Sequence, residues 1–156
     1  MDTIDIKAVE RLQTAGRESW ATLGVALGMT GPAAAERVRR LEADGVIRGY
    51  AALVDPEAVG AGLTAFVSVT LERPGNRAAF LRRVARLTAI QECHHVAGDY
   101  DYLLKVRCAG TADLDHLLTD ELKAVPGIVR TRTTVVLRTL KESVIVPLPD
   151  TDVVAA

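Results

Sequence analysis

The sequence is poor in cysteine, lacks any long hydrophobic run and carries almost no net charge. Its two cysteines, Cys93 and Cys108, are too few for a disulfide framework and form no CxxC pair, so we expect reduced, buried thiols. No apolar run approaches the ~20 residues that cross a bilayer, and residues 1–5 lack the basic and then apolar pattern of a signal peptide. These absences predict a cytoplasmic location and no membrane partner.

The net charge of -1 shows none of the overall basicity that many nucleic-acid binders have. Residues 1–50 are also balanced, with seven Lys or Arg side chains and seven Asp or Glu side chains. Any DNA binding must therefore depend on where a few arginines lie. Hydrophobic residues make up 49% of the chain, which is enough to bury the core of one large or two small domains.

Residues 23–32, followed by residues 36–42, have the pattern of a helix-turn-helix. Gly24 and Gly28 are small enough to let two helices cross closely, and Gly28 supplies a turn that ends the first helix. The hydroxyl of Thr30 is placed to cap the next helix. The second helix of such a motif presents its N-terminal half to the DNA major groove, so the pattern predicts a DNA-binding regulator.

The second helix of this motif carries the side chains that we assign to DNA. On a helical wheel Ala33, Arg37 and Arg40 share one stripe, while Val38 and Leu41 point to the core. We assign Arg37 to a guanine and Arg40 to a phosphate. The full set of predicted DNA-contacting residues is Thr30, Gly31, Ala33, Arg37, Arg39, Arg40 and Arg48.

The chain divides near its first third. Residues 1–54 form the predicted helix-turn-helix domain, with three short helices and then a wing and connecting strand in residues 45–54. Residues 55–64 contain one proline and two glycines and are the predicted linker. Residues 65–146 are the second domain. Residues 147–156 have two prolines and no amphipathic pattern, and we predict a loosely ordered tail.

The second domain alternates between strand and helix periodicities. Strands are expected at residues 65–71, 92–97, 102–108 and 128–140, and helices at residues 76–87 and from residue 111 to the Pro126-Gly127 pair. This βαββαβ order predicts the ferredoxin-like fold, a four-stranded antiparallel sheet with both helices on one face.

Apolar residues are expected on both faces of this sheet. They include Val67, Val69, Leu103, Val106, Val135 and Leu137. A sheet that is apolar on both faces needs a second sheet against it, so the pattern predicts a homodimer.

Taken together, these segments resemble the Lrp/AsnC family, the feast/famine transcription regulators. The matching motifs are Leu27-Gly28-Met29-Thr30 at the turn, residues 36–42, residues 45–51, Asp55-Pro56, Glu92-Cys93, residues 96–106 and residues 126–129. The resemblance implies an α+β chain with an N-terminal winged helix-turn-helix domain and a C-terminal RAM/ACT-like domain that binds an effector and oligomerises. It also implies dimers, higher oligomers such as octamers, an amino acid as the small-molecule effector, double-stranded DNA as the partner, and no cofactor.

Three features depart from the family pattern. Gly24 stands where the family usually has alanine, and a glycine inside a helix costs roughly 1 kcal/mol relative to alanine. Ala97 stands where the family often has threonine. Residues 30–35 offer almost no side chains that hydrogen-bond to bases, so we expect specificity to come largely from DNA bendability and half-site spacing.

The family's effector motif maps onto a predicted hairpin turn at residues 98–101. An amino acid carries an ammonium group, which Asp99 or Asp101 could bind, and a carboxylate, which backbone N–H groups near Gly98 could bind. A turn whose aspartates only cap the backbone is the alternative. The predicted effector-binding residues are Gly98, Asp99, Tyr100, Asp101, Thr133 and Thr134.

Cysteine and histidine side chains offer a rival interpretation. His94 and His95 are adjacent on a predicted strand, so their side chains point to opposite faces and do not share one metal ion. Cys93, His95 and Cys108 could form a soft metal site, but buried thiols and a hydrogen-bonded histidine are the preferred interpretation. We therefore expect neither a metal site nor a catalytic site.

Two other function classes remain open. Siroheme decarboxylases resemble the family in architecture, but the arginines of residues 37–40 and the turn before them have no purpose in such an enzyme. A small-molecule binding module without DNA binding would explain the neutral N-terminal part and the alanine-rich recognition helix.

Overall fold

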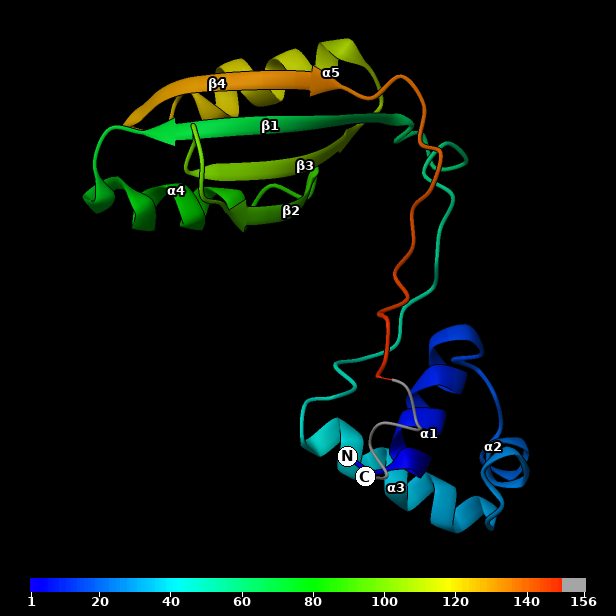
Figure 1. Cartoon of the computed structure of the whole chain (residues 1–156). Coiled ribbons are helices and arrows are strands. Elements are labelled where there is room, and N and C mark those ends of the chain that lie inside the picture. The colour runs from blue at the N-terminus through cyan, green and yellow to red at the C-terminus, as the bar shows by residue number, and fades with distance from the viewer. Residues whose placement is uncertain (150–156) are drawn as a thin grey trace. The chain divides into compact units, whose positions relative to one another are not determined.

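The computed structural model describes residues 1–149 and divides them into two compact units (Figure 1). The N-terminal unit comprises residues 1–52 together with residues 141–149, and the C-terminal unit comprises residues 53–140. Residues 141–146, which the sequence pattern assigns to the second domain, thus belong to the N-terminal unit. Within residues 1–149, the structure contains no helix with the length and apolar character of a membrane span.

Three helices build the N-terminal unit, as predicted: α1 (Thr3–Thr14), α2 (Trp20–Leu27) and α3 (Gly31–Ala43). Each helix begins at a side-chain cap, because the oxygens of Asp2, Ser19 and Thr30 each accept a hydrogen bond from the backbone N–H three residues later. The small core between the helices consists of Leu12, Leu23, Ala34 and Val38.

The turn between α2 and α3 depends on two glycines. Gly28 ends α2 with a φ of 70°, a left-handed conformation that glycine adopts without strain. A methyl group at Gly24 would lie 2.8 Å from both the Gly31 nitrogen and the Met29 oxygen, so the turn backbone packs directly on this helix position. The close approach explains why a glycine stands inside α2 despite its low helix propensity.

The predicted wing and connecting strand in residues 45–54 are absent, because the structure has no strand between α3 and residue 63. Gly45, with a φ of 71°, turns the chain out of α3, and the N–H groups of Val46 and Ile47 donate back to the Leu41 oxygen. These amides close the end of the helix instead of pairing with another strand.

The C-terminal unit has the predicted βαββαβ order. Its elements are β1 (Leu63–Leu71), the short 3-10 turn η1 (Pro74–Asn76), α4 (Arg77–Val84), β2 (Ile90–His95), β3 (Tyr102–Cys108), α5 (Thr111–His116), the π-helical turn η2 (Leu117–Leu122) and β4 (Ile128–Val135). The strands form one antiparallel sheet in the order β2-β3-β1-β4. Together with the helical N-terminal unit, this arrangement confirms the predicted α+β class with a ferredoxin-like second domain.

Helices α4 and α5 cover one face of the sheet, and the main core lies between them and the strands (Figure 1). Phe80 of α4 is fully buried there and its ring lies 4.7 Å from that of Tyr102. The fully buried strand residues of this core are Ala65, Val67, Val69, Leu104 and Val106.

The sheet is apolar on one face rather than on both. Cross-strand pairing places Val67, Val69 and Val106 together on the helix-covered face. The opposite face, which we call the helix-free face, carries Phe66 and Leu103 among polar side chains. Its polar residues include Ser68, Thr70, Lys105, Arg130 and Arg132. The sequence predicts a homodimer because it expects two apolar faces, and the structure does not support this argument.

Strand β4 ends at Val135, five residues before the predicted end. Its partner β1 begins at Leu63, and the last bond between them is donated by the Val136 N–H to the Thr64 oxygen. The chain then reaches α1, where the Gln13 side chain donates to the Val146 oxygen and accepts from the Val146 N–H. Residues 147–149 of the predicted loose tail line a hollow against α1, and residues 150–156 lie outside the described residues.

The small N-terminal core makes its stability sensitive to single truncations. We expect Leu23→Ala to lower the free energy of unfolding of this unit by about 2–5 kcal/mol, because a fully buried leucine leaves a cavity. Fluorescence of Trp20, the one tryptophan of the chain, reports urea unfolding of this unit alone. Val25→Ala is the control, since Val25 on the same helix is 82% exposed. Equal midpoints for the two variants would contradict the described core.

Candidate functional site

The start of α3 is built from residues with structural tasks. The Thr30 hydroxyl accepts the Ala33 N–H at 3.3 Å, so it serves as the helix cap. A methyl group at Gly31 would lie 3.2 Å from the Ala21 backbone, so this position packs against α2. Ala33 is exposed and carries no polar group. Of these three predicted DNA-contacting residues, only Ala33 presents an exposed side chain that has no structural task in the turn.

Arg37 is bound inside the N-terminal unit. Its Nη1 donates to Asp2 Oδ2 and to Asp5 Oδ1, each at 2.6 Å, and its side chain is 20% exposed. Asp2 and Asp5 are also the capping box of α1, where each carboxylate accepts the backbone N–H of the other residue. The guanidinium that the helical wheel assigns to a guanine therefore joins α3 to the first turn of α1.

This cluster shifts both carboxyl groups toward the ionised form. The Arg37 hydrogen bond and then the Asp5 N–H lower the pKa of Asp2. Burial acts to raise the pKa of Asp5, but the hydrogen bonds from the Asp2 N–H and from Arg37 outweigh it and the pKa is lowered. The ion cluster therefore stabilises the unit at neutral pH and loses this contribution in acid.

Three other predicted arginines remain on the surface. Arg39 is 66% exposed and pairs with Glu36 one turn earlier on α3. Arg40 is 58% exposed, with Nη2 3.5 Å from Asp5 Oδ1. Arg48 is exposed beyond the end of α3. These side chains are free enough to reach a phosphate, because exposed ion pairs of this kind contribute little and exchange easily.

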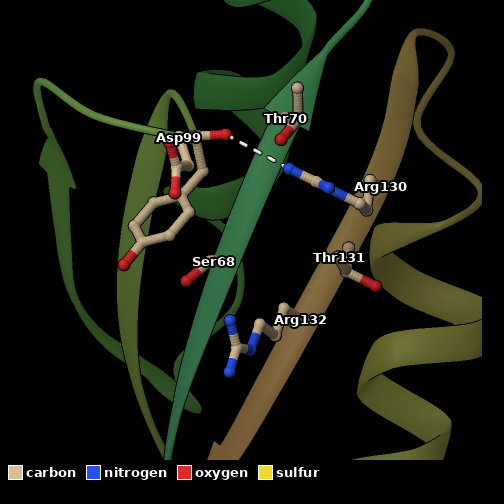
Figure 2. Close-up of a pocket in the computed structure, with 7 residues that line it drawn as sticks. Ser68, Thr70, Asp99, Arg130, Thr131 and Arg132 are labelled. Atoms are coloured by element: carbon tan, nitrogen blue, oxygen red, sulfur yellow. Dashed lines mark hydrogen bonds between the residues drawn. The ribbon is translucent and has the colours of Figure 1, made fainter.

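A second candidate site is a cavity of about 580 Å³ on the C-terminal unit, within the size range of small-molecule sites. It lies between the turn at residues 98–101 and strands β1 and β4 (Figure 2). Its lining residues are Ser68, Thr70, Asp99, Tyr100, Arg130, Thr131 and Arg132. The cross-strand pairs Ser68–Arg132 and Thr70–Arg130 bring these side chains together on the helix-free face.

Charges of both signs line this cavity. Arg130 Nη2 donates to the Asp99 backbone oxygen at 3.2 Å, which ties the turn to β4 (Figure 2). Neither the Asp99 carboxylate nor the Arg132 guanidinium makes a hydrogen bond or ion pair within residues 1–149. Figure 2 shows Arg132 extending toward Ser68, whereas Thr131 points away from them. An anion and a cation, neither with a partner among the described residues, thus line one cavity.

The structure separates the predicted effector-binding residues into two groups. Asp99 and Tyr100 line the cavity. Asp101 does not, because its Oδ2 accepts the Leu71 N–H at 2.7 Å and caps the end of β1. Gly98, with a φ of 143°, shapes the turn.

Thr133 and Thr134 do not line the cavity either. Thr133 pairs with Val67 and therefore lies on the helix-covered face, while Thr134 pairs with Phe66 farther along β4. Sequence reasoning missed Ser68, Thr70, Arg130 and Arg132. Only the register between β1 and β4 brings them beside the turn, and no local pattern reports that register.

Cysteine and histidine do not gather into a site. Burial raises the pKa of the Cys93 thiol, and it also raises that of Cys108, with Asp113 adding to the effect. The ring of His95 lies 5.2 Å from that of Tyr102, and His94 contacts Glu92. Within residues 1–149, no three His, Cys, Asp or Glu side chains are placed to hold one metal ion.

Comparison with known families identifies the family of this chain. Residues 1–42 match the AsnC-type helix-turn-helix domain, and residues 64–146 match the Lrp/AsnC ligand-binding domain. The chain belongs to the Lrp/AsnC family. It is a transcriptional regulator with a helix-turn-helix DNA-binding domain, which confirms both the resemblance and the function predicted from the sequence.

Relatives of this Lrp/AsnC regulator match nearly its whole length. It is 43% identical over 145 residues to the leucine-responsive regulatory protein of Haemophilus influenzae, covering 92% of this chain and 87% of that protein. It is 42% identical over 145 residues to the Escherichia coli leucine-responsive regulatory protein, with 92% and 88% covered.

Two similar solved structures contain an amino acid. A transcriptional regulator of Neisseria meningitidis in complex with L-methionine has a TM-score of 0.90 at 29% identity, covering 94% of this chain and 96% of that one. A feast or famine regulatory protein of M. tuberculosis complexed with L-methionine has a TM-score of 0.84 at 36% identity, covering 90% and 95%.

The ion cluster of α1 and α3 generates a stability prediction. We expect Arg37→Met to lower the stability of the N-terminal unit by about 3 kcal/mol at pH 7, because the Asp5 side chain, 6% exposed, loses its main cation. The two lowered pKa values stabilise the fold fully above their unfolded value of ~3.9, and this contribution disappears as the pH falls through the folded values. The variant should therefore lose less stability on acidification than the wild type does.

Trp20 fluorescence in urea at pH 7 and pH 3 measures both effects. Arg40→Met is the matched control, because Arg40 lies farther from Asp5 and is more exposed. An Arg37→Met protein with wild-type stability but no DNA binding would contradict the structural role and support the assignment of Arg37 to a base.

Proposed function

We propose that this regulator binds a free amino acid in the cavity between the residue 98–101 turn and strands β1 and β4, and that occupancy changes its DNA binding or assembly. The observation that carries the proposal is the pair of opposite charges in the cavity, Asp99 and Arg132, whose charged groups have no partner in the described part of the chain. An α-amino acid presents an ammonium and a carboxylate, and each finds its complement there. The two relatives in complex with L-methionine support the ligand class.

Polar groups around these charges suit the same ligand. The hydroxyls of Ser68 and Thr70 lie on the strand that borders the cavity and can hydrogen-bond to either end group. Arg130 is already used to hold the turn, so we assign carboxylate binding to Arg132. Asp101 is likewise used as a cap, so we assign the ammonium to Asp99. Thr133 and Thr134 have no part in this assignment.

Calorimetric titration with the twenty amino acids tests this proposal. For the amino acid that binds, we expect Asp99→Asn and Arg132→Gln each to weaken affinity about 10- to 100-fold, because each removes one charge-assisted hydrogen bond. The N-acetyl and amide derivatives of that amino acid, which lack one charge each, should bind as weakly. Arg138→Gln is the control, since Arg138 is exposed and outside the cavity. No heat with any amino acid would overturn the proposal.

For DNA, we propose that the exposed surface of α3 contacts the duplex through Ala33, Arg39 and Arg40, with Arg48 on a flanking phosphate. The helix offers few groups that read bases, because Thr30 caps the helix and Arg37 is held by Asp2 and Asp5. Specificity then rests largely on DNA bendability and on the spacing of half-sites in a dimer, about one helical turn or a multiple of it.

Fluorescence anisotropy across a salt series tests this DNA surface, with duplex from upstream of the protein's own gene. Each phosphate that the protein neutralises contributes about -0.9 to the slope of log affinity against log salt. We expect Arg39→Gln/Arg40→Gln to weaken binding and to flatten that slope by about 0.9 for each phosphate no longer neutralised. Lys7→Gln/Arg17→Gln removes equal charge from exposed positions on α1 and in the loop after it, and serves as the control. A flat slope for the wild type would instead favour a ligand-binding module without DNA binding.

We also propose a homodimer that assembles further, for example into an octamer, and that has no catalytic role. On the helix-free face, Phe66 is 37% exposed beside Leu103, and a second sheet would cover both. Sedimentation with and without the amino acid measures the mass of the assembly. A tetrapyrrole that copurifies with the protein would contradict the non-enzymatic assignment and revive the decarboxylase alternative.

A further inference from the structure

A strongly basic stretch of the chain lies in the C-terminal unit, away from the helix-turn-helix sequence. The 19 residues from Arg73 to Gln91 contain five arginines and no Asp or Glu, although the whole chain has a charge of -1. Helix α4 occupies the middle of this segment. By contrast, residues 1–50 carry seven charges of each sign. An excess of positive charge therefore lies outside the N-terminal unit, to which DNA binding is assigned.

The arginines of this segment have different environments. Arg83 is paired with Glu121 of η2, and the buried Phe80 and Val84 anchor the same side of α4 in the core. Arg73 lies 3.6 Å from Glu72. The other three are exposed and make no ion pair or hydrogen bond within residues 1–149. They are Arg77, Arg82 and Arg86.

The exposed surface formed by residues 77–86 allows close contact with a polyanion. Arg77 and Arg82 lie on α4 and Arg86 lies in the turn directly after it, so three like charges repel one another within ten residues. Ala78 on α4 and Ala85 directly after it are exposed, so no bulky side chain at these positions keeps a partner away from the arginines. A rigid helix, held by the core on its other side, presents Arg77 and Arg82 without a cost for ordering its backbone.

We propose that Arg77, Arg82 and Arg86 form a second, sequence-independent contact for the DNA phosphate backbone, in addition to the contact made by α3. Arginine binds phosphate through paired N–H groups and is the usual residue for this task. The chain is a DNA-binding regulator whose helix-turn-helix sequence has no net positive charge, so the three exposed arginines supply a cationic surface that DNA longer than the specific site can bind. The proposal goes beyond the α3 contact and does not depend on the effector.

The test compares DNA of two lengths with the variant Arg77→Gln/Arg82→Gln/Arg86→Gln. A short duplex of about 20 base pairs carries two half-sites one turn apart, and a long duplex of about 150 base pairs extends well beyond them. We expect unchanged affinity for the short duplex. For the long duplex we expect at least about tenfold weaker binding at low salt, and a salt slope lower by about 0.9 for each phosphate that the variant no longer neutralises.

The matched control removes three positive charges elsewhere, in Lys123→Gln/Arg138→Gln/Lys141→Gln, all at exposed positions. The proposal is overturned if this control weakens long-duplex binding equally, or if the α4 variant binds both duplexes as the wild type does. It is also overturned if light scattering shows that the α4 variant changes the mass of the assembly, since the patch then contacts a second copy of the chain. If α3 does not contact DNA, the wild type fails to bind the short duplex. This result is distinguishable from failure of the second contact, which affects only the long duplex.

Discussion

The buried carboxylate of Asp5 is the interaction on which the helix-turn-helix depends. It closes the capping box of α1 and, through Arg37, holds α3 against the first turn of α1. A buried carboxylate without its cation is strongly unfavourable, so α1 and α3 are bound to each other electrostatically as well as by their small apolar core. The direction of α3 within the N-terminal unit therefore follows from a charge cluster as well as from apolar packing.

Arginines that are close in the sequence differ in whether they are held by a partner, in each part of the molecule. Arg37 holds the first helix and Arg83 holds η2 to α4, while their neighbours on the same helices remain exposed. On β4, Arg130 ties down the residue 98–101 turn, whereas Arg132, two residues later, has no partner within residues 1–149. Net charge is therefore a poor guide to this chain, because several of its cations are neutralised by neighbours before any ligand arrives.

Local signals in the sequence predicted most of the fold. The α2–α3 turn follows from Gly28 and Thr30, and the order of strands and helices follows from hydrophobic periodicity. The features that the sequence did not predict depend on pairing between residues that are far apart in the sequence. The helical wheel placed Arg37 on a surface stripe, but the carboxylates that bind it are 32 and 35 residues away in sequence. The same limit hid the cavity, because the turn at residues 98–101 was visible whereas the β1–β4 register that supplies Arg132 was not.

The return of the chain to α1 makes the DNA-binding unit discontinuous in sequence. Residues 145–149 lie along α1, where Gln13 bonds to the Val146 backbone and Ile6 borders the same hollow. A domain exchange with another member of the family that transfers residues 1–52 alone would leave this surface of α1 facing a foreign segment. Recombination of such regulators is then constrained at two segments that are far apart in the sequence, because residues 1–52 and residues 145–149 have to change together to keep their fit.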